Sequence, residues 1–321
     1  MNVLLFLGAG FSREAGLPLQ KDFHEFAYSA VDEGYYNIDV YRGVSAAYNI
    51  ARYIEGKEDV NLEDAFGVLE YNYFTHNDSY RVAYYDNLDD PNSFQPAYNG
   101  IPIAEARRNF IDAIELIFGP NDDTSYKNID LYKFFFEKIL EKHKLMIITT
   151  NYDLLCKTAL DKCKNPKTGE SVGYSHFPAE APFSQSNDFV TVLKLHGSID
   201  WKETSIDTAN IVPPTWMKKF DKFGKYNLVW SAAEDAISYS DLILFIGYSM
   251  VEIDKGIEYL LKSGFQPRIR GSKPKKIIVL TKRAEVEERY RKLENYGTVK
   301  EFEIIPAHFK EFVNTKIDDI L

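Results

Sequence analysis

The chain has 321 residues, 45% of them hydrophobic and 27% charged, which fits a globular protein of one large domain or two modest ones. A net charge of −10 argues against direct nucleic-acid binding. Two cysteines, Cys156 and Cys163, exclude a disulfide framework and fit a reducing cytoplasm. Because no apolar stretch is long enough for a membrane span or a secretory signal, we expect a cytoplasmic protein without a membrane anchor.

The chain opens with an apolar run at residues 3–7 that ends in Gly-Ala-Gly at residues 8–10. A short apolar run closed by glycines predicts a strand buried on both faces of a parallel sheet. We expect a helix to follow, whose N-terminal N–H groups favour a phosphate. Arg13 stands where the usual dinucleotide fingerprint has its third glycine, which weakens an ordinary dehydrogenase interpretation. The alternative is a plain turn between a core strand and a helix.

Residues 20–142 predict a mostly helical insertion, with helices at 20–33, 103–118 and 129–142. Asn61 is a candidate cap for a further helix. Twelve of the 22 tyrosines lie between residues 28 and 98. This aromatic richness predicts either an interface or the core of a small helical subdomain, and periodicity favours the core.

The remaining sequence alternates between apolar strands and amphipathic helices. We expect a long connection at 164–188 and an irregular stretch at 198–227. The strands are predicted at 145–149, 189–195, 242–246, 276–280 and 301–305, and the helices at 228–239, 252–263, 284–294 and after Ala307. This alternation predicts an α/β fold, a doubly wound Rossmann-like parallel sheet with the helical insertion between its first two core strands. We expect one domain over residues 1–321.

Small polar clusters follow four of the predicted strands. In a parallel sheet the carboxyl ends of the strands share one edge, and ligands bind outside that edge. Each cluster alone has a structural explanation as a helix cap, a turn or a buried histidine, but four such coincidences at one edge are much less probable than one. The clusters are Gly8-Ala9-Gly10-Phe11-Ser12, Thr150-Asn151-Tyr152-Asp153, His196-Gly197 and Gly247-Tyr248-Ser249.

The sequence gives no support for a metal site. The two cysteines precede His196, are not spaced as a C-x-x-C pair, and have no second cysteine pair to join. A Walker-type phosphate loop and a G-x-S-x-G nucleophile motif are also absent from the sequence.

Taken together, these motifs resemble the sirtuin superfamily, in order over nearly the whole chain apart from the insertion. The spellings at 149–153, 212–216 and 246–249, with Asp254 beyond, look closest to the bacterial sirtuin-like branch of anti-phage defence effectors that consume NAD. Two features depart from protein-deacylating sirtuins. Those carry a four-cysteine zinc module after the His-Gly motif, and they follow Gly-x-Pro with Asp-Phe-Arg, whereas residues 19–23 here lack the arginine.

The resemblance implies that the ligand is NAD, and that no metal is needed. Asn151 and His196 would be catalytic: Asn151 would hold ribose hydroxyls or a water, and His196 would accept a proton. Residues 8–12 would approach the pyrophosphate, Asp153 would lie near the nicotinamide carboxamide, and residues 247–249 would contact the adenosine side. The implied NAD-binding set is Gly8, Ala9, Gly10, Phe11, Ser12, Pro18, Thr150, Asp153, Gly247, Tyr248, Ser249 and Asp254.

The function implied by the resemblance is NAD⁺ hydrolysis to nicotinamide and ADP-ribose, as an effector of anti-phage defence. Unrestrained hydrolysis would kill the host, so we expect control through a homo-oligomer or a separately encoded partner, such as a HerA-like ATPase or an Argonaute-type protein. Two alternatives stay open. One is an NAD-dependent protein deacylase or ADP-ribosyltransferase, and the other is a non-catalytic NAD or ADP-ribose sensor.

Overall fold

A computed structural model describes the chain except for residues 35–36, 88, 120–125, 167, 176–188, 204–205, 214–224, 251–253, 267–274 and 321. It divides into two compact units. The sheet unit comprises Met1–Gly16, Asp122–Gly197 and Trp216–Leu321, and the helical unit comprises Leu17–Asn121 and Ser198–Thr215. Three residues of the motif at 212–216, Pro214, Thr215 and Trp216, lie outside the described residues.

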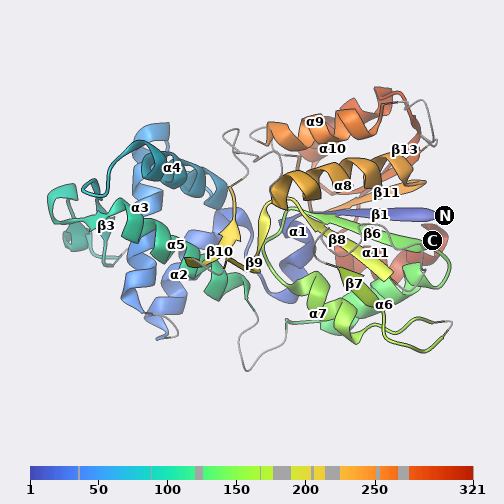
Figure 1. Ribbon diagram of the computed structural model, residues 1–321, viewed down its shortest axis with the longest axis horizontal. Helices are drawn as coiled ribbons and strands as arrows, with labels where there is room; N and C mark the ends of the chain where they lie inside the picture. Colours follow the sequence, from blue (N-terminus) through green and yellow to red (C-terminus); the bar gives the residue numbers. More distant parts are fainter. Residues whose placement is uncertain are drawn as a thin grey trace. The chain divides into compact units, whose positions relative to one another are not determined.

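The sheet unit contains one seven-stranded sheet whose strand pairs are all parallel (Figure 1). The strand order is β13-β12-β11-β1-β6-β8-β7. The strands are β1 (Asn2–Leu7), β6 (Lys144–Thr149), β7 (Gly173–Ser175), β8 (Phe189–Lys194), β11 (Leu242–Ile246), β12 (Lys275–Leu280) and β13 (Val299–Ile305). The predicted doubly wound fold is therefore confirmed.

Helices cover both faces of this sheet. Figure 1 shows α8 (Lys225–Tyr239), α9 (Lys255–Gly264) and α10 (Ala284–Arg291) on one face. It shows α6 (Ile129–Leu140), α7 (Leu155–Lys162) and α11 (Phe309–Thr315) on the other. Because both faces are covered, residues 3–7 of β1 are fully buried, which explains their unbroken apolar run. Shorter helical segments are α1 (Ala9–Ser12), η1 (Arg13–Ala15), η6 (Lys292–Asn295) and α12 (Ile317–Ile320).

In the part that the structure describes, the helical unit is built on four helices. They are α2 (Phe23–Asp32), α3 (Ile38–Glu55), α4 (Leu62–Thr75) and α5 (Ile103–Phe118). Its short elements are η2 (Gln20–Asp22), η3 (Pro91–Ser93), η4 (Ala97–Asn99), β2 (Arg81–Val82), β3 (Tyr84–Tyr85), β4 (Phe94–Gln95), β5 (Ile101–Pro102), β9 (Gly197–Glu203) and β10 (Ile206–Ile211). The sequence places the insertion at 20–142, whereas this unit ends its first segment at Asn121 and adds residues 198–215.

The connection at 164–188 contains a short strand that was not predicted, and the expectation of an irregular stretch at 198–227 is wrong. Strand β7 lies within the predicted connection at 164–188, and the two-stranded sheet of β9 and β10 occupies part of the predicted irregular stretch at 198–227. These strands are short or polar and lack the continuous apolar run that marks the central strands, so their sequence signal is weak.

Helix caps explain where two helices of this unit begin and end. Asn61 accepts hydrogen bonds from the N–H groups of Glu63 and Asp64, so the predicted cap of α4 is confirmed. The 18-residue α3 is absent from the sequence prediction, although Asn37 caps its start and Gly56, at φ +64°, closes its end. Its tyrosines obscure the helical period because Tyr41 and Tyr48 are buried while Tyr53 is 91% exposed.

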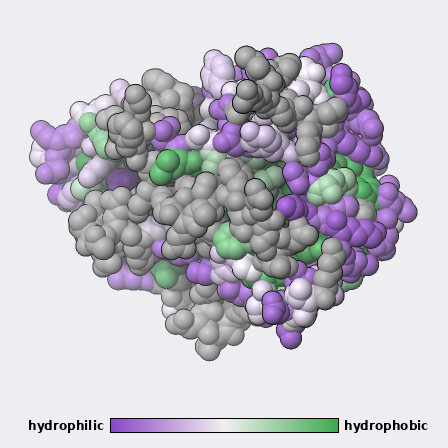
Figure 2. Space-filling view, turned by 45° about the vertical axis from the view of Figure 1, so that its right-hand side comes forward, coloured by the Kyte–Doolittle hydropathy of each residue, from purple (hydrophilic) through white to green (hydrophobic). Residues whose placement is uncertain are grey.

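The described residues contain no helix that is both long and apolar enough to cross a membrane. Hydrophilic residues dominate the described part of the face in Figure 2, and hydrophobic ones form small groups. This distribution fits the acidic composition of the chain.

A buried histidine makes the helical unit sensitive to pH. His24 stacks on the Tyr48 ring with centroids 4.5 Å apart, and within the described residues its Nε2 has no hydrogen-bond partner. Burial, with a smaller contribution from the charge of Arg52, lowers the pKa of His24 from 6.5 to about 4. The folded protein therefore keeps this imidazole neutral at pH values where the unfolded chain protonates it.

We expect the free energy of unfolding to fall as the pH is lowered from 6.5 to 4, because the unfolded state binds more protons in that window. The contribution of His24 is about 3 kcal/mol at its full extent. His24→Phe keeps the ring and should remove this part of the slope in urea titrations, whereas Tyr48→Phe, which keeps His24, should retain it. Equal slopes in wild type and His24→Phe would contradict the assignment.

Candidate functional site

The turns after β1 and β11 interlock through glycines. The Gly8 N–H donates to the Ile246 carbonyl at 3.0 Å, and the Gly10 N–H donates to the Gly247 carbonyl at 2.9 Å. A Cβ on Gly247 would lie 2.1 Å from the Phe11 nitrogen, and one on Gly8 would lie 2.6 Å from the Tyr248 Cα. The backbones approach too closely for any side chain, so glycine is required here for packing between the turns.

The packing of the two turns leaves the predicted phosphate site with fewer available N–H donors than the sequence suggests. The expected helix does follow the glycine turn, but α1 spans only Ala9–Ser12 before a 3₁₀ turn, so it has little macrodipole. The N–H groups of Gly8 and Gly10 donate to the β11 side, and the Phe11 N–H donates to the Gly8 carbonyl. In this conformation, these three donors are already used within the chain.

Phe11 anchors the glycine turn through its side chain. Its ring is 1% exposed and lies 4.7 Å from the Phe309 ring and 5.0 Å from the Tyr132 ring, measured between centroids. The Tyr132 hydroxyl also donates to the Phe11 carbonyl at 2.8 Å. Any contact of Phe11 with a ligand would therefore have to come from its backbone.

A polar network joins the turns after β1 and β6. Asn151 Nδ2 donates to the Gly8 carbonyl at 3.0 Å and to Ser12 Oγ at 2.9 Å. Ser12 Oγ donates in turn to Asp153 Oδ2 at 2.8 Å. Because both amide hydrogens of Asn151 are used, Oδ1 is the atom through which this side chain can accept a hydrogen bond from a ligand.

Asp153 is a buried hydrogen-bond acceptor in this network. Its Oδ1 accepts the Leu155 N–H at 3.0 Å, at the start of α7, so the helix-cap interpretation describes part of its role. Burial raises the pKa of Asp153, while the charge of Lys194 and the hydrogen bond from Ser12 oppose the increase. A contact between Asp153 and a nicotinamide group stays a prediction.

Lys194 is a site-supporting residue that the sequence analysis missed. At the end of β8 it is 3% exposed, and its Nζ donates to the carbonyls of Tyr152, at 2.9 Å, and Asp153. It therefore fixes the turn that carries Asn151. The sequence did carry a signal for this role, because Lys194 lies within a strand predicted to be buried. A buried lysine needs hydrogen-bond partners such as these carbonyls.

His196 and Asp254 form a second buried pair at the same edge of the sheet. His196 Nε2 lies 2.8 Å from Asp254 Oδ2, and the two side chains are 2% and 1% exposed. The pair joins the segment after β8 to the start of α9, where Asp254 Oδ1 also accepts the Ile257 N–H at 3.4 Å. The carboxylate of Asp254, predicted to contact a ligand, therefore lies next to the predicted catalytic base.

The remaining predicted residues are placed as follows. The backbone carbonyls of Tyr248 and Ser249 accept hydrogen bonds from Tyr290 and Arg289 of α10, which fixes the turn after β11. Thr150 follows β6, and its N–H donates to the Leu7 carbonyl. Pro18 is buried and belongs to the helical unit, whereas the other predicted residues all belong to the sheet unit.

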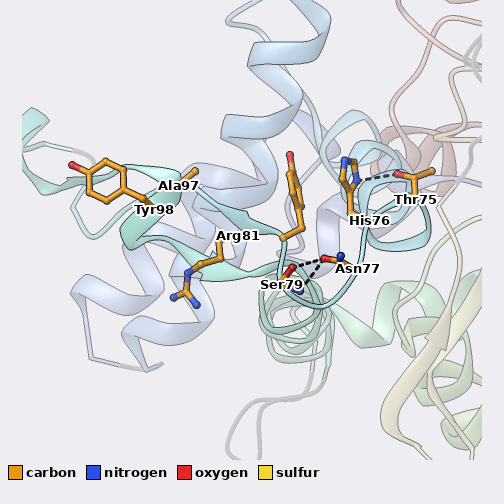
Figure 3. A pocket seen from close by; sticks show the side chains of 8 residues that line it. Thr75, His76, Asn77, Ser79, Arg81, Ala97 and Tyr98 are labelled. Carbon is orange, nitrogen blue, oxygen red and sulfur yellow. Dashed lines mark hydrogen bonds between the residues drawn. The ribbon is translucent and has the colours of Figure 1, made fainter.

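The hollows among the described residues include two that bear on the site. One of about 100 Å³ lies between α9 and α10 and is lined by Tyr248, Asp254 and Arg289 among others. It has room for roughly three waters, which is too little for a nucleotide. The other, of about 560 Å³, lies in the helical unit and is lined by residues that include His76, Arg81 and Tyr98 (Figure 3). No predicted site residue lines it.

The described residues contain no group of three or more histidine, cysteine or acidic side chains that could hold a metal ion. Cys156 and Cys163 are both buried and unbridged, and burial raises the pKa of each thiol. Neither thiol is therefore suited to nucleophilic chemistry.

A family model described as a SIR2-like domain matches residues 145–299, somewhat less than half of the chain. The matched range includes Asn151, His196 and Asp254 and begins after the glycine turn at 8–10. No curated protein matches the sequence significantly.

Several solved structures are similar to the chain. One concerns the structural basis for the mechanism and regulation of Sir2 enzymes; it is 14% identical, with a TM-score of 0.43, and the match covers 99% of this chain and 91% of that one. A Sir2 homologue in complex with NAD is 13% identical, with a TM-score of 0.38 and coverage of 99% and 88%. Sir2 bound to an acetylated peptide is 12% identical, with a TM-score of 0.40 and coverage of 99% and 92%.

The interlocked turns predict a severe effect of Gly247→Ala. Gly247 has φ +67° and its added Cβ would meet backbone atoms, so we expect a loss of roughly 3 to 5 kcal/mol in the free energy of unfolding. The matched control is Gly169→Ala in the same unit, at φ +74° with open space around it, which should cost about 1 to 2 kcal/mol. Equal losses in urea titrations would show that the close approach does not matter.

Proposed function

We propose that this chain is an NAD glycohydrolase, which cleaves NAD⁺ to nicotinamide and ADP-ribose. The observation that carries the proposal is the presence, at the carboxyl edge of one parallel sheet, of an amide that does not titrate and a buried histidine whose Nε2 lies 2.8 Å from a carboxylate oxygen. The match to a SIR2-like domain supports it, because the matched range contains both Asn151 and His196.

The residues at this edge fit parts of the ligand. Asn151 Oδ1 can accept a hydrogen bond from a ribose hydroxyl or from a water. Residues 247–249 form a turn whose backbone carbonyls are hydrogen-bonded to side chains of α10. Because the glycine turn uses the N–H groups of Gly8, Gly10 and Phe11 internally, we propose that it serves the pyrophosphate mainly by admitting it close to the backbone. The other predicted contacts, at Ala9, Ser12, Pro18, Thr150 and Asp153, remain proposals.

The chain's task in this reaction is to orient the ribose and to activate one water. The bond between the ribose carbon and the nicotinamide nitrogen breaks, nicotinamide leaves as a neutral molecule, and a water oxygen bonds to the ribose carbon. His196 takes the proton of that water and passes it to solvent, so the products are nicotinamide, ADP-ribose and one proton. Asn151 orients the hydroxyl or the water throughout without changing its charge.

Hydrolysis is favoured over transfer by the sequence after the His-Gly motif. The chain has no cysteine beyond Cys163, whereas the deacylating sirtuins it resembles use four cysteines there to shape one wall of the acyl-lysine cleft. The presence of both Asn151 and His196 favours an enzyme over a sensor, because binding alone does not need the pair.

We further propose that the protein acts in anti-phage defence by depleting NAD in the cytoplasm. This role rests on the resemblance to the bacterial branch named above. An enzyme of this kind needs restraint in the absence of infection, so we propose that assembly into a homo-oligomer, or contact with a HerA-like ATPase or an Argonaute-type protein, activates it.

The proposed activity predicts the products and two inactive variants. Purified protein incubated with NAD⁺ should release nicotinamide and ADP-ribose in equal amounts, measured by chromatography. His196→Ala and Asn151→Ala should each lose about 10²- to 10⁴-fold in kcat while remaining folded. His76→Ala, which removes an exposed histidine of the helical unit, should keep full activity. Acylated ADP-ribose or labelled protein as the main product would favour transfer over hydrolysis.

Buried lysines offer a matched test of how the site is supported. Lys194→Met should weaken equilibrium NAD⁺ binding about ten-fold or more, because the turn with Asn151 loses its support. Lys275→Met removes similar bonds, from Nζ to the carbonyls of Ser238 and Ser240, at the amino end of β12. It should cost similar stability without affecting binding. Equal effects of the two variants on binding would reject a specific role for Lys194.

A further inference from the structure

We infer that one face of helix α4, in the helical unit, is a docking surface for a partner protein that surrounds apolar side chains with basic ones. This surface, which we call the outer face, consists of Val68, Tyr71 and Phe74. The inference goes beyond the proposed catalysis, because it concerns the other unit of the chain and can be tested without NAD⁺.

Helix α4 is apolar on two sides. Phe66 and Leu69 are fully buried where α4 packs against α3 and α5. On the outer face, Tyr71 is 47% and Phe74 57% exposed, and Val68 is partly exposed. These three residues are spaced three apart, so they lie along one side of the helix. A surface helix normally has polar residues on its exposed side, so apolar residues there indicate a further contact.

Exposed apolar side chains are concentrated in the helical unit. Among the described residues, thirteen large hydrophobic side chains are exposed, and eight of them belong to this unit, which has fewer than half of the residues of the chain. Tyr53, at 91% the most exposed of them, lies near the end of α3. Aromatic side chains are enriched at protein interfaces and are frequent among the residues that contribute most to affinity. The helical unit therefore offers most of these side chains to a partner.

The charge of the helical unit defines the chemistry of that partner. Residues 17–121 and 198–215 contain 21 acidic and 8 basic residues, whereas the rest of the chain contains 27 acidic and 30 basic ones. The acidic excess of the protein therefore lies entirely in this unit. Its field repels nucleic acids, anionic membranes and the same unit of a second copy, and it attracts a basic protein surface.

The charges at the two ends of α4 agree with this sign. Lys57 and Arg107 each form an ion pair with an acidic residue of α4, which balances their charge. Asp59 precedes the helix and Asp78 follows it, and both are exposed and make no ion pair among the described residues. An apolar stripe with acidic groups at both ends matches an amphipathic helix whose apolar face is flanked by lysine or arginine.

A hollow adjoins the outer face at the end of α4. It has a volume of about 560 Å³, and the residues that line it include Thr75, which follows Phe74 directly. Figure 3 shows Tyr98 and His76 on opposite sides of Arg81 in this hollow. The residues that line it include no acidic one, so it suits an apolar or aromatic side chain of the partner better than a lysine. An aromatic side chain can stack on its rings and on the guanidinium, which gives the partner an anchor beside the outer face.

A synthetic peptide tests this surface directly. The probe is a fluorescein-labelled amphipathic helix of about 18 residues with leucine on one face and lysine on the other, and a control peptide has glutamate in place of lysine. We expect the lysine peptide to bind with a micromolar Kd at low salt and about ten-fold more weakly at roughly 0.3 M salt. The glutamate peptide should bind at least about ten-fold more weakly than the lysine peptide. No binding of the lysine peptide, or equal binding of the two peptides, overturns the inference.

Matched variants locate the binding site. Tyr71→Ser with Phe74→Ser removes the two most exposed side chains of the outer face and should weaken binding of the lysine peptide about ten-fold or more. Leu228→Ser with Tyr259→Ser removes two side chains of similar exposure from the sheet unit and should change binding less than about two-fold. Circular dichroism checks that both variants are folded. Equal losses would mean that the peptide binds elsewhere, which contradicts the inference.

Charge variants give an independent readout. Asp59→Lys with Asp78→Lys should weaken binding about five-fold at low salt and less than about two-fold at roughly 0.3 M salt, because the attraction is then screened. Asp318→Lys with Asp319→Lys makes the same change of charge at exposed positions of the sheet unit and should have a smaller effect at low salt. An effect of the control pair as large as that of the first pair would show that only the net charge of the protein matters, and the docking surface would be rejected.

A second copy of the chain is the competing occupant, and sedimentation velocity distinguishes it. We expect the wild type and the Tyr71→Ser, Phe74→Ser variant to sediment alike. Self-association of the wild type that this variant loses would assign the outer face to another copy and overturn the inference. The peptide assay contains no NAD⁺, so a wild type that binds the peptide but releases no nicotinamide would reject the proposed function and leave the docking surface in place.

Discussion

The close approach of two backbone turns, after β1 and after β11, is the constraint on which the site depends. Gly8, Gly10 and Gly247 leave no room for a Cβ, and direct N–H to carbonyl bonds connect the turns. Phe11 then secures the first turn in an aromatic cluster on one face of the sheet, and Tyr290 secures the second from the other face. These contacts together define the conformation of both turns at the carboxyl edge of the sheet.

Polar groups at this edge are organised in two buried sets. Ser12, Asn151 and Asp153 satisfy one another between β1 and β6, while Lys194 holds the carbonyls of the same turn. His196 and Asp254 form the other set between β8 and α9. A preorganised arrangement of this kind suits catalysis, because the groups need not reorganise when charge develops in the substrate.

The central strands and the location of the site at their carboxyl ends were predictable, because runs such as residues 242–246 are apolar on both faces and polar residues follow them directly. Partners across the fold were not predictable, because contacts such as those of Lys194 with Asp153 and of His196 with Asp254 join residues far apart in the chain. The burial of the Phe11 side chain and the short length of α1 were not predicted either, because both also depend on contacts with distant parts of the chain. The prediction missed helix α3 for a different, local reason. Some of its tyrosines are buried and others exposed, so the positions of tyrosine do not mark the buried face of the helix.

The central place of β1 also has a consequence for synthesis of the protein. β1 pairs with β6, which begins at Lys144, and with β11, which ends at Ile246. At roughly 5 to 20 residues per second, a ribosome needs about 10 to 50 seconds to add the chain up to its second partner. During that interval this strand, which is buried in the folded protein, has an unsatisfied edge, which makes it a segment for co-translational chaperones to protect.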